Sequence, residues 1–358
     1  MCPAKTFRIA IISDIHYAGV EERAHCADFH ARERIKHPAA RIFARLFHHF
    51  IWLREHGGHN HMLDRFLAAV ATSPSPPRSG GEGRGEVVLR AHGEHTFGPF
   101  DLVVANGDYS CDFAQVGVSD PAAFASAQEC LGKLRARFGD AFRATLGDHD
   151  LGKTGMYTGT GSMTLASWQA ATERLGIEPF WRVQFGKYVL LGITSSLVAL
   201  PVLKMELAAG EAAAWERLRE SHLKQIRDAF AGLKSGERVI LFCHDPSALP
   251  YLWREEQVRE KISQFEQTII GHLHTNLVLR AGRVLAGFPT ITFLGKGARR
   301  TSAGLGEAKL WKPFRVRLCP APMGIQLLKD GGWLSAELDP DAIHPARFEF
   351  HPLKWQGE

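Results

Sequence analysis

The stretch "FRIAIISDIH" (residues 7–16) joins a short apolar run to a polar segment that carries Asp14 and His16. The run is rich in β-branched residues, which favours a buried strand, and the polar residues after it would lie at the carboxyl end of that strand. Because Asp14 and His16 are two residues apart, both can face one centre only if the backbone leaves regular extended geometry there. The stretch predicts a strand that delivers two candidate ligands to one site.

The same pattern recurs along the chain. Strand-like runs at 101–105, 239–243 and 267–270 each end in polar residues. A further predicted strand, "AFRAT" (141–145), precedes "LGDHD" (146–150). In layered α/β proteins, ligands bind at the carboxyl ends of the strands. The acidic and histidine residues delivered there suit Mn, Fe, Zn or Ni; they are Asp14, His16, Asp108, Asp148, His149, Asp150, His244, His272 and His274.

The rest of the chain predicts one large domain over 1–358. Helical spacing predicts helices over 38–56, 121–138, 163–175 and about 206–233. A long insertion, about 20–98, carries helices of its own and a Pro-, Gly- and Ser-rich loop at 72–86 that we expect to be flexible. From about 276 to 358 we expect a β-rich portion, with short strands in "RVLAG", "TITFL", "RVRLC", "GIQLL" and "WLSAEL".

Composition narrows the class of protein. The 358 residues are 45% apolar, which is ample for a buried core. The net charge of +5 is mild, and the basic residues are not massed in blocks, so nucleic acid is not indicated as a partner. No stretch approaches the roughly 18 to 20 apolar residues that cross a bilayer. The six scattered cysteines suit reduced thiols, and with no signal sequence at the N-terminus we expect a cytoplasmic protein.

Five motifs, in order, resemble those of the calcineurin-like metallophosphoesterase family: DxH (14–16), GD (107–108), GDHD (147–150), a single His (244) and GHLH (271–274). The family pattern is DxH, GD, GNH followed by Asp or Glu, His, and GHxH. The resemblance implies an α/β sandwich of two mixed sheets flanked by helices. It also implies an enzyme that hydrolyses a phosphoester with two metal ions. It leaves the insertion and most of the C-terminal portion unexplained.

The resemblance also implies which residues hold the metals. One ion would take Asp14, His16, Asp108 and His274, and the other Asp108, Asp148, His244 and His272, with Asp108 bridging them. Two ions about 3.5 to 4 Å apart can clamp the phosphoryl oxygens and hold a hydroxide that attacks phosphorus in line. The resemblance ranks Mn and Fe first, Zn fits the same ligands, and Mg is less favoured with so many imidazoles.

The segment "LGDHD" carries two further expectations. By the resemblance, His149 stabilises the transferring phosphoryl group or protonates the leaving oxygen, and Asp150 is placed to hold its imidazole. The family usually has Asn where this chain has Asp148. The additional negative charge predicts tighter metal retention, weaker Lewis acidity and a preference for diesters over monoester dianions.

Several alternatives stay open at this point. The first choice is a phosphodiesterase acting on a small nucleotide-type or phosphorylated metabolite. The others are a phosphomonoesterase and a catalytically silent, metal-binding interaction scaffold. "HGGHNH" (56–61) fits a third metal site less well than a solvated loop. Arg299 and Arg300 could contact substrate phosphate, although solvated loop charge is the simpler interpretation. Cys243 is expected to be a core residue rather than a nucleophile.

Overall fold

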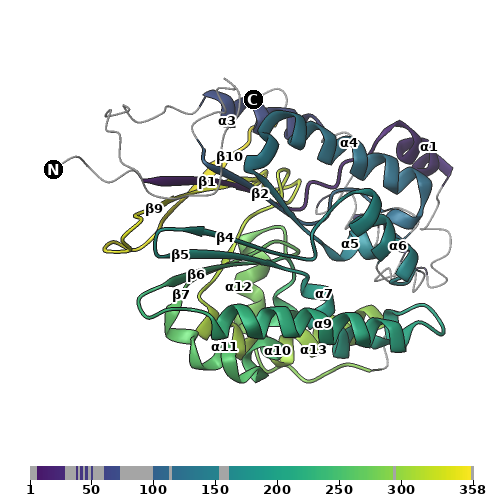
Figure 1. Ribbon diagram of the computed structural model, residues 1–358. Helices are drawn as coiled ribbons and strands as arrows, with labels where there is room; N and C mark the ends of the chain where they lie inside the picture. Colours follow the sequence, from purple (N-terminus) through teal and green to yellow (C-terminus); the bar gives the residue numbers. More distant parts are fainter. Residues whose placement is uncertain are drawn as a thin grey trace.

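Two five-stranded β-sheets stack face to face, with helices on both outer sides (Figure 1). This computed structural model describes residues 6–28, 38, 41–42, 45–46, 50, 60–72, 100–112, 115–152, 161–292 and 296–355. The first sheet has the order β10-β9-β1-β2-β3, and the second has the order β4-β5-β6-β7-β8. The architecture confirms the α/β sandwich that the motifs predict.

Both sheets are mixed. In the first sheet β1, β2 and β3 are parallel, and β9 and β10 add an antiparallel edge. In the second sheet β5 to β8 are parallel, and β4 is antiparallel to β5. The strands of the first sheet are β1 (Phe7–Ile12), β2 (Leu102–Asn106), β3 (Phe142–Thr145), β9 (Gly332–Leu338) and β10 (Arg347–Pro352). Those of the second are β4 (Phe180–Phe185), β5 (Tyr188–Ile193), β6 (Arg238–Cys243), β7 (Phe265–Ile270) and β8 (Val316–Leu318).

Alternation along the strands builds two kinds of apolar layer. Ile9 and Ile11 of β1 join Leu190 of β5 and Phe242 of β6 in one buried cluster that contains residues of both sheets. The residues between them in sequence, such as Ala10, belong to a second cluster shared with the helices. Since successive side chains of a strand point to opposite faces, the first cluster fills the space between the sheets and the second lies on their outer faces.

Helices cover each outer face (Figure 1). On the side of the first sheet lie α1 (Val20–Asp28), α3 (His61–Thr72) and α4 (Pro121–Phe138). On the side of the second lie α9 (Ala212–Ala231), α10 (Leu249–Arg254), α11 (Glu256–Glu260), α12 (Asn276–Val284) and α13 (Lys296–Gly306). The described residues also form four short helices: α5 (Asp148–Leu151), α6 (Leu165–Gln169), α7 (Ser195–Val198) and α8 (Leu200–Leu203).

The predicted helices have mixed outcomes. Helix α4 spans the predicted range, with Asp120 accepting backbone N–H groups at its start. The pattern at 163–175 becomes α6 followed by a π-helical turn at Ala170–Arg174, and the pattern at 206–233 becomes α9. Most of the helix predicted over 38–56 lies outside the described residues, and those described there, residues 38, 41–42, 45–46 and 50, are helical. The loop predicted over 72–86 also lies outside them, apart from Thr72 at the end of α3.

Part of the C-terminal prediction is wrong. "RVRLC" and "WLSAEL" contain β8 and β9, as expected, but "RVLAG" begins inside α12 and "GIQLL" forms turns. The described part of "TITFL", residues 290–292, has no regular structure. Residues 276–284 form helix α12 rather than a strand because Thr275 caps the first turn and because Leu279 and Gly282 lie on one buried face.

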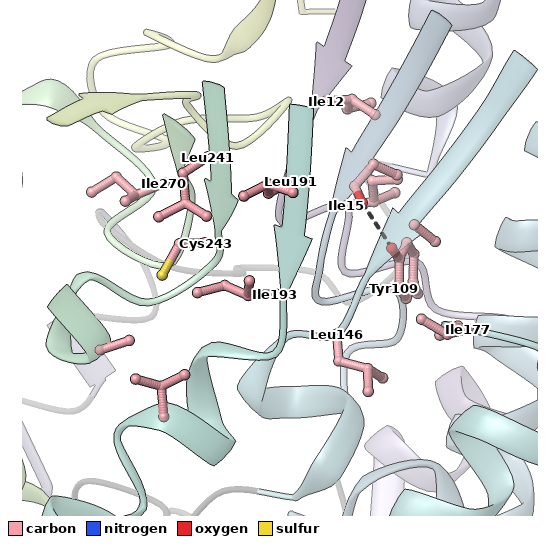
Figure 2. Close-up of a cluster of buried hydrophobic side chains, with 14 of the residues drawn as sticks. Ile12, Ile15, Tyr109, Leu146, Ile177, Leu191, Ile193, Leu241, Cys243 and Ile270 are labelled. Carbon is pink, nitrogen blue, oxygen red and sulfur yellow. Dashed lines mark hydrogen bonds between the residues drawn. The ribbon is translucent and has the colours of Figure 1, made fainter. Parts of the chain in front are cut away.

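Apolar side chains from both sheets support the strand ends (Figure 2). Tyr109 and Leu146 come from loops of the first sheet, and Ile193 and Cys243 end strands of the second. The Tyr109 hydroxyl donates to the backbone oxygen of Ala105, at 2.9 Å. The polar loops of the site thus start from a packed and hydrogen-bonded base. No helix among the described residues is both long and apolar enough to cross a membrane.

Candidate metal centre

The backbone at the strand ends is bent into the left-handed region. The φ angles are 54° at Asp14, 47° at His16, 58° at Asp108, 53° at His272 and 59° at His274. Residues with a Cβ rarely adopt this conformation, and such strain persists only where the surroundings fix it, often at functional sites. The bend predicted for Asp14 and His16 is therefore confirmed, and the GHLH segment has the same kind of bend.

The loops of the first sheet interlock through hydrogen bonds. The backbone N–H of Asp14 donates to the Gly107 oxygen at 3.1 Å, and that of His16 donates to the Asp108 oxygen at 3.0 Å. The His149 N–H donates to Asp108 Oδ1 at 2.9 Å. A Cβ on Gly147 would lie 2.0 Å from Asp108 Oδ1, so only glycine lets that loop approach so closely.

The second sheet contributes imidazoles that face these loops. His244 Nδ1 donates to the Asn106 backbone oxygen at 2.6 Å, because a carbonyl can only accept. Its Nε2 faces Asp108 Oδ2 at 3.1 Å and Asp148 Oδ1 at 3.3 Å, so it is the ring nitrogen placed to bind a metal ion in exchange for a proton. Such an outer hydrogen bond fixes the tautomer of metal-binding histidines. The backbone N–H of His272 donates to Asp14 Oδ1 at 2.8 Å, which ties the GHLH loop to the loop that carries Asp14.

The structure brings all seven predicted ligands into two adjoining clusters. In each cluster the potential ligand atoms lie within 4.8 Å of one another. The clusters approach at Asp108, whose Oδ2 lies 3.8 Å from His16 Nε2. The first cluster is Asp14, His16 and His274, and the second is Asp108, Asp148, His244 and His272. A third overlapping group, His16, Asp108 and His149, places His149 beside both.

The charges of the site fit divalent cations. Asp14 and Asp108 are buried, and the charged side chains near them are imidazoles rather than Lys or Arg. Burial raises the pKa of Asp14 to about 6, with His244 opposing it. Burial also disfavours ionisation of Asp108, but His244 holds the pKa of Asp108 below its ordinary value. Burial would lower the pKa of His244, yet Asp108 and Asp14 raise it well above the usual range. Without a metal ion, protonated imidazoles thus balance the negative charge of the carboxylates; with metal ions bound, the ions would balance it instead.

Asp150 does not take the predicted place beside the His149 imidazole. Its two oxygens accept backbone N–H groups of Asp108, Tyr109 and Gly147, at 3.1, 3.0 and 2.8 Å. Burial raises the pKa of Asp150 to about 7, with Asp108 adding to the shift. Asp150 therefore ties the second and third loops together rather than holding the imidazole.

Asp112 has the position expected of Asp150. Its Oδ2 lies 4.0 Å from His149 Nδ1, and its Oδ1 accepts the backbone N–H groups of Val116 and Gly117 at 3.1 and 2.8 Å. Burial raises the pKa of Asp112 well above its usual value. In the sequence Asp112 is marked only as the last residue of "GDYSCD". Its approach to His149 depends on a turn that no motif describes.

Comparison with protein families agrees with this geometry. The family model for calcineurin-like phosphoesterases matches residues 7–276, which include all seven clustered residues. The chain belongs to the calcineurin-like phosphoesterase family. No curated protein matches it.

Two solved structures are weakly similar to this chain. A purple acid phosphatase from yellow lupin (Lupinus luteus) seeds has a TM-score of 0.33 and 10% identity, over 76% of this chain and 38% of its own. A phosphopantetheinyl hydrolase from Mycobacterium tuberculosis has a TM-score of 0.30 and 13% identity, over 50% of this chain and 75% of its own.

The remaining candidates of the sequence lie outside the centre. Arg300 is buried, and its Nη1 donates to both oxygens of Glu206 at 2.9 and 2.8 Å, so it is a structural ion pair rather than loop charge. Cys243 is fully buried, and burial raises the pKa of its thiol, which matches the predicted core role. Most of "HGGHNH" lies outside the described residues.

Proposed function

We propose that this chain is a metal-dependent phosphoester hydrolase whose centre holds two ions. The observation that carries the proposal is the meeting of the two clusters at Asp108, at the carboxyl ends of strands from both sheets. One ion would be held by Asp14, His16, Asp108 and His274, and the other by Asp108, Asp148, His244 and His272. When bound, the ions supply Lewis acidity at the phosphoryl oxygens and an activated water for in-line attack. Manganese and iron are the first candidates, with zinc as the next.

His149 would act on the substrate rather than on a metal. It belongs to neither of the two main clusters, and its side chain is 16% exposed. Its ring centroid lies 4.9 Å from that of His16 at an interplanar angle of 85°, so the imidazole reaches the rim of the centre. From there it can donate a proton or a hydrogen bond to a phosphoryl or leaving oxygen. Asp112 would orient this imidazole, and would favour its protonated form when the carboxyl is ionised.

The charge of the centre favours diesters as substrates. Asp148 Oδ1 lies 3.0 Å from His272 Nδ1 and 3.3 Å from His244 Nε2, so the carboxylate that replaces the usual Asn points into the second cluster. A third carboxylate repels a monoester dianion more strongly than a diester monoanion. A small nucleotide-type or phosphorylated metabolite with a diester bond is the substrate class that we propose.

The test compares two model substrates on one protein. Chelator-stripped protein is reloaded with Mn, Fe, Zn or Mg, and hydrolysis of bis-p-nitrophenyl phosphate is measured beside that of p-nitrophenyl phosphate. The proposal predicts metal-dependent turnover that is faster with the diester. Equal or faster turnover of the monoester would contradict the diester preference. Silence with every metal, in protein that contains two bound ions, would contradict the hydrolase proposal for these substrates and favour the scaffold alternative.

A further inference from the structure

A cavity of about 590 Å³ lies at the far edge of the second sheet, away from the metal centre. Its walls come from β7, the end of α12, the 3₁₀-helix η7 (Ala308–Phe314) and the start of β8. Helix α12 begins two residues after His274 and ends at this cavity, so its nine residues separate the two places by about 13 Å. The volume is within the range of small-molecule sites. The polar lining residues are Gln267, Arg283, Lys309, Trp311, Lys312 and Arg315.

The charge of this cavity has one sign. Among the residues that the structure describes, four cationic side chains line it and no carboxylate does. In the described part of the chain, no Asp or Glu forms an ion pair with Lys309, Lys312 or Arg315. Some surface cations elsewhere are paired, for example Arg254 with Glu307 and Arg347 with Glu337. Gathering like charges around a hollow costs free energy unless an anion compensates them.

Trp311 gives an independent indication of a missing acceptor. The residue is 5% exposed, and its buried indole Nε1 has no hydrogen-bond partner among the described residues. A buried N–H without an acceptor costs about 1 to 3 kcal/mol, and native proteins rarely leave one. The indole N–H can only donate, as can Lys and Arg, so the donors of this cavity suit a ligand with acceptor oxygens.

The walls around these donors are fixed by the backbone. Arg283 Nη2 donates to the Val316 oxygen at 2.9 Å, which holds the guanidinium against β8. The Gln267 amide donates to the Arg315 oxygen, and Arg315 itself has φ of 50°, in the left-handed region. A Cβ on Gly287 would lie 3.2 Å from Lys309 Nζ, so the ammonium rests against the turn after α12. A preformed arrangement of donors binds an anion without first having to be ordered.

We propose that this basic cavity binds a phosphate group, separately from the catalytic centre. Phosphate oxygens accept charge-assisted hydrogen bonds from Lys and Arg and a further one from an indole N–H, which matches the donors here. The phosphate can belong to a small soluble molecule or to a phospholipid headgroup. Beside the cavity Val284 is 84% exposed and Leu285 45% exposed, which is compatible with a headgroup at a lipid surface.

Two probes on the full chain distinguish these sources. Calorimetric titration with α,β-methylene-ADP, whose bridging carbon resists hydrolysis, tests for a soluble ligand. Co-sedimentation with vesicles of phosphatidylcholine containing phosphatidic acid, against phosphatidylcholine alone, tests for a headgroup. For whichever probe binds, the Lys309→Glu/Lys312→Glu variant should lose at least about tenfold in affinity. Turnover at the metal centre should not change in this variant.

Matched variants separate a site from general charge. Arg182→Glu/Lys187→Glu, on the β4–β5 hairpin, changes the net charge equally and should bind like the wild type. Trp311→Phe keeps an aromatic ring but removes the N–H, so it should bind several-fold more weakly without losing thermal stability. Asp108→Ala should retain the binding, which separates it from the metal centre. Equal affinity in both charge-reversed proteins, or no binding of either probe, would overturn the proposal.

Discussion

The loops of the two sheets contribute different chemistry to the same centre. The first sheet delivers all three candidate carboxylates, Asp14, Asp108 and Asp148, together with His16. The second delivers only imidazoles, His244, His272 and His274. The first set is held together by its own backbone hydrogen bonds, whereas His244 and His272 bond to Asn106 and Asp14 of the opposite sheet. A balanced ligand set therefore exists only where the two sheets pack together.

The largest effect should follow removal of Asp108, the residue that both proposed metal sites share. Asp108→Ala deletes a carboxylate from each proposed metal site and the acceptor of the His149 N–H. We expect the protein to bind fewer than two metal ions per chain, and we expect turnover to fall by about 10⁴-fold or more. Metal analysis and steady-state kinetics measure both. Asp140→Ala, an exposed aspartate beyond α4, is the matched control. Full metal content in Asp108→Ala would contradict the bridging role.

His149 should separate catalysis from metal binding. His149→Ala should lower turnover by roughly 10²-fold or more, with both ions retained, because it removes a proton donor rather than a ligand. Asp112→Asn keeps an oxygen for the Val116 and Gly117 N–H groups and should cost about tenfold. If Asp112 acts through His149, the double variant should be no slower than His149→Ala alone. Additive losses, or an equal loss of metal in both variants, would show that these roles are wrong.

Asp150 should affect folding more than catalysis. Asp150→Asn places an amide NH₂ where a carboxylate oxygen accepts a backbone N–H, so we expect a loss of about 1 to 3 kcal/mol in the free energy of unfolding. Urea titration measures this loss. Turnover per folded molecule should change far less than in His149→Ala. A variant with wild-type stability but His149→Ala kinetics would restore the role that the sequence alone suggests for Asp150.

The smallest expected effect concerns substrate charge. Asp148→Asn removes one of the three candidate carboxylates of the metal centre and restores the residue that is usual in the family. The ratio of monoester to diester turnover should rise by a factor of about 3 to 10. Paired kinetics with the two p-nitrophenyl substrates measure the ratio, with Asp140→Asn as a control. An unchanged ratio would show that the third carboxylate does not set substrate preference.

The sequence predicts which residues cluster at the centre, because each follows an apolar strand and the strands end at one edge. It does not predict Asp112, since three residues of loop separate it from Asp108 and its position depends on hydrogen bonds with the backbone of Val116 and Gly117. It misplaces "RVLAG" and "GIQLL" because short apolar runs suit strand and helix equally until capping and packing decide. Strand β10 lacks a signal for another reason: as an edge strand it is largely exposed.

The most direct test of the centre is anomalous diffraction from crystals of the manganese-loaded protein. We expect two peaks about 3.5 to 4 Å apart, with the Asp108 carboxylate between them, carboxylates of the first sheet on one side and imidazoles of the second on the other. A single peak, or two peaks that do not share Asp108, would contradict the claim that the packing of the two sheets creates a dinuclear site.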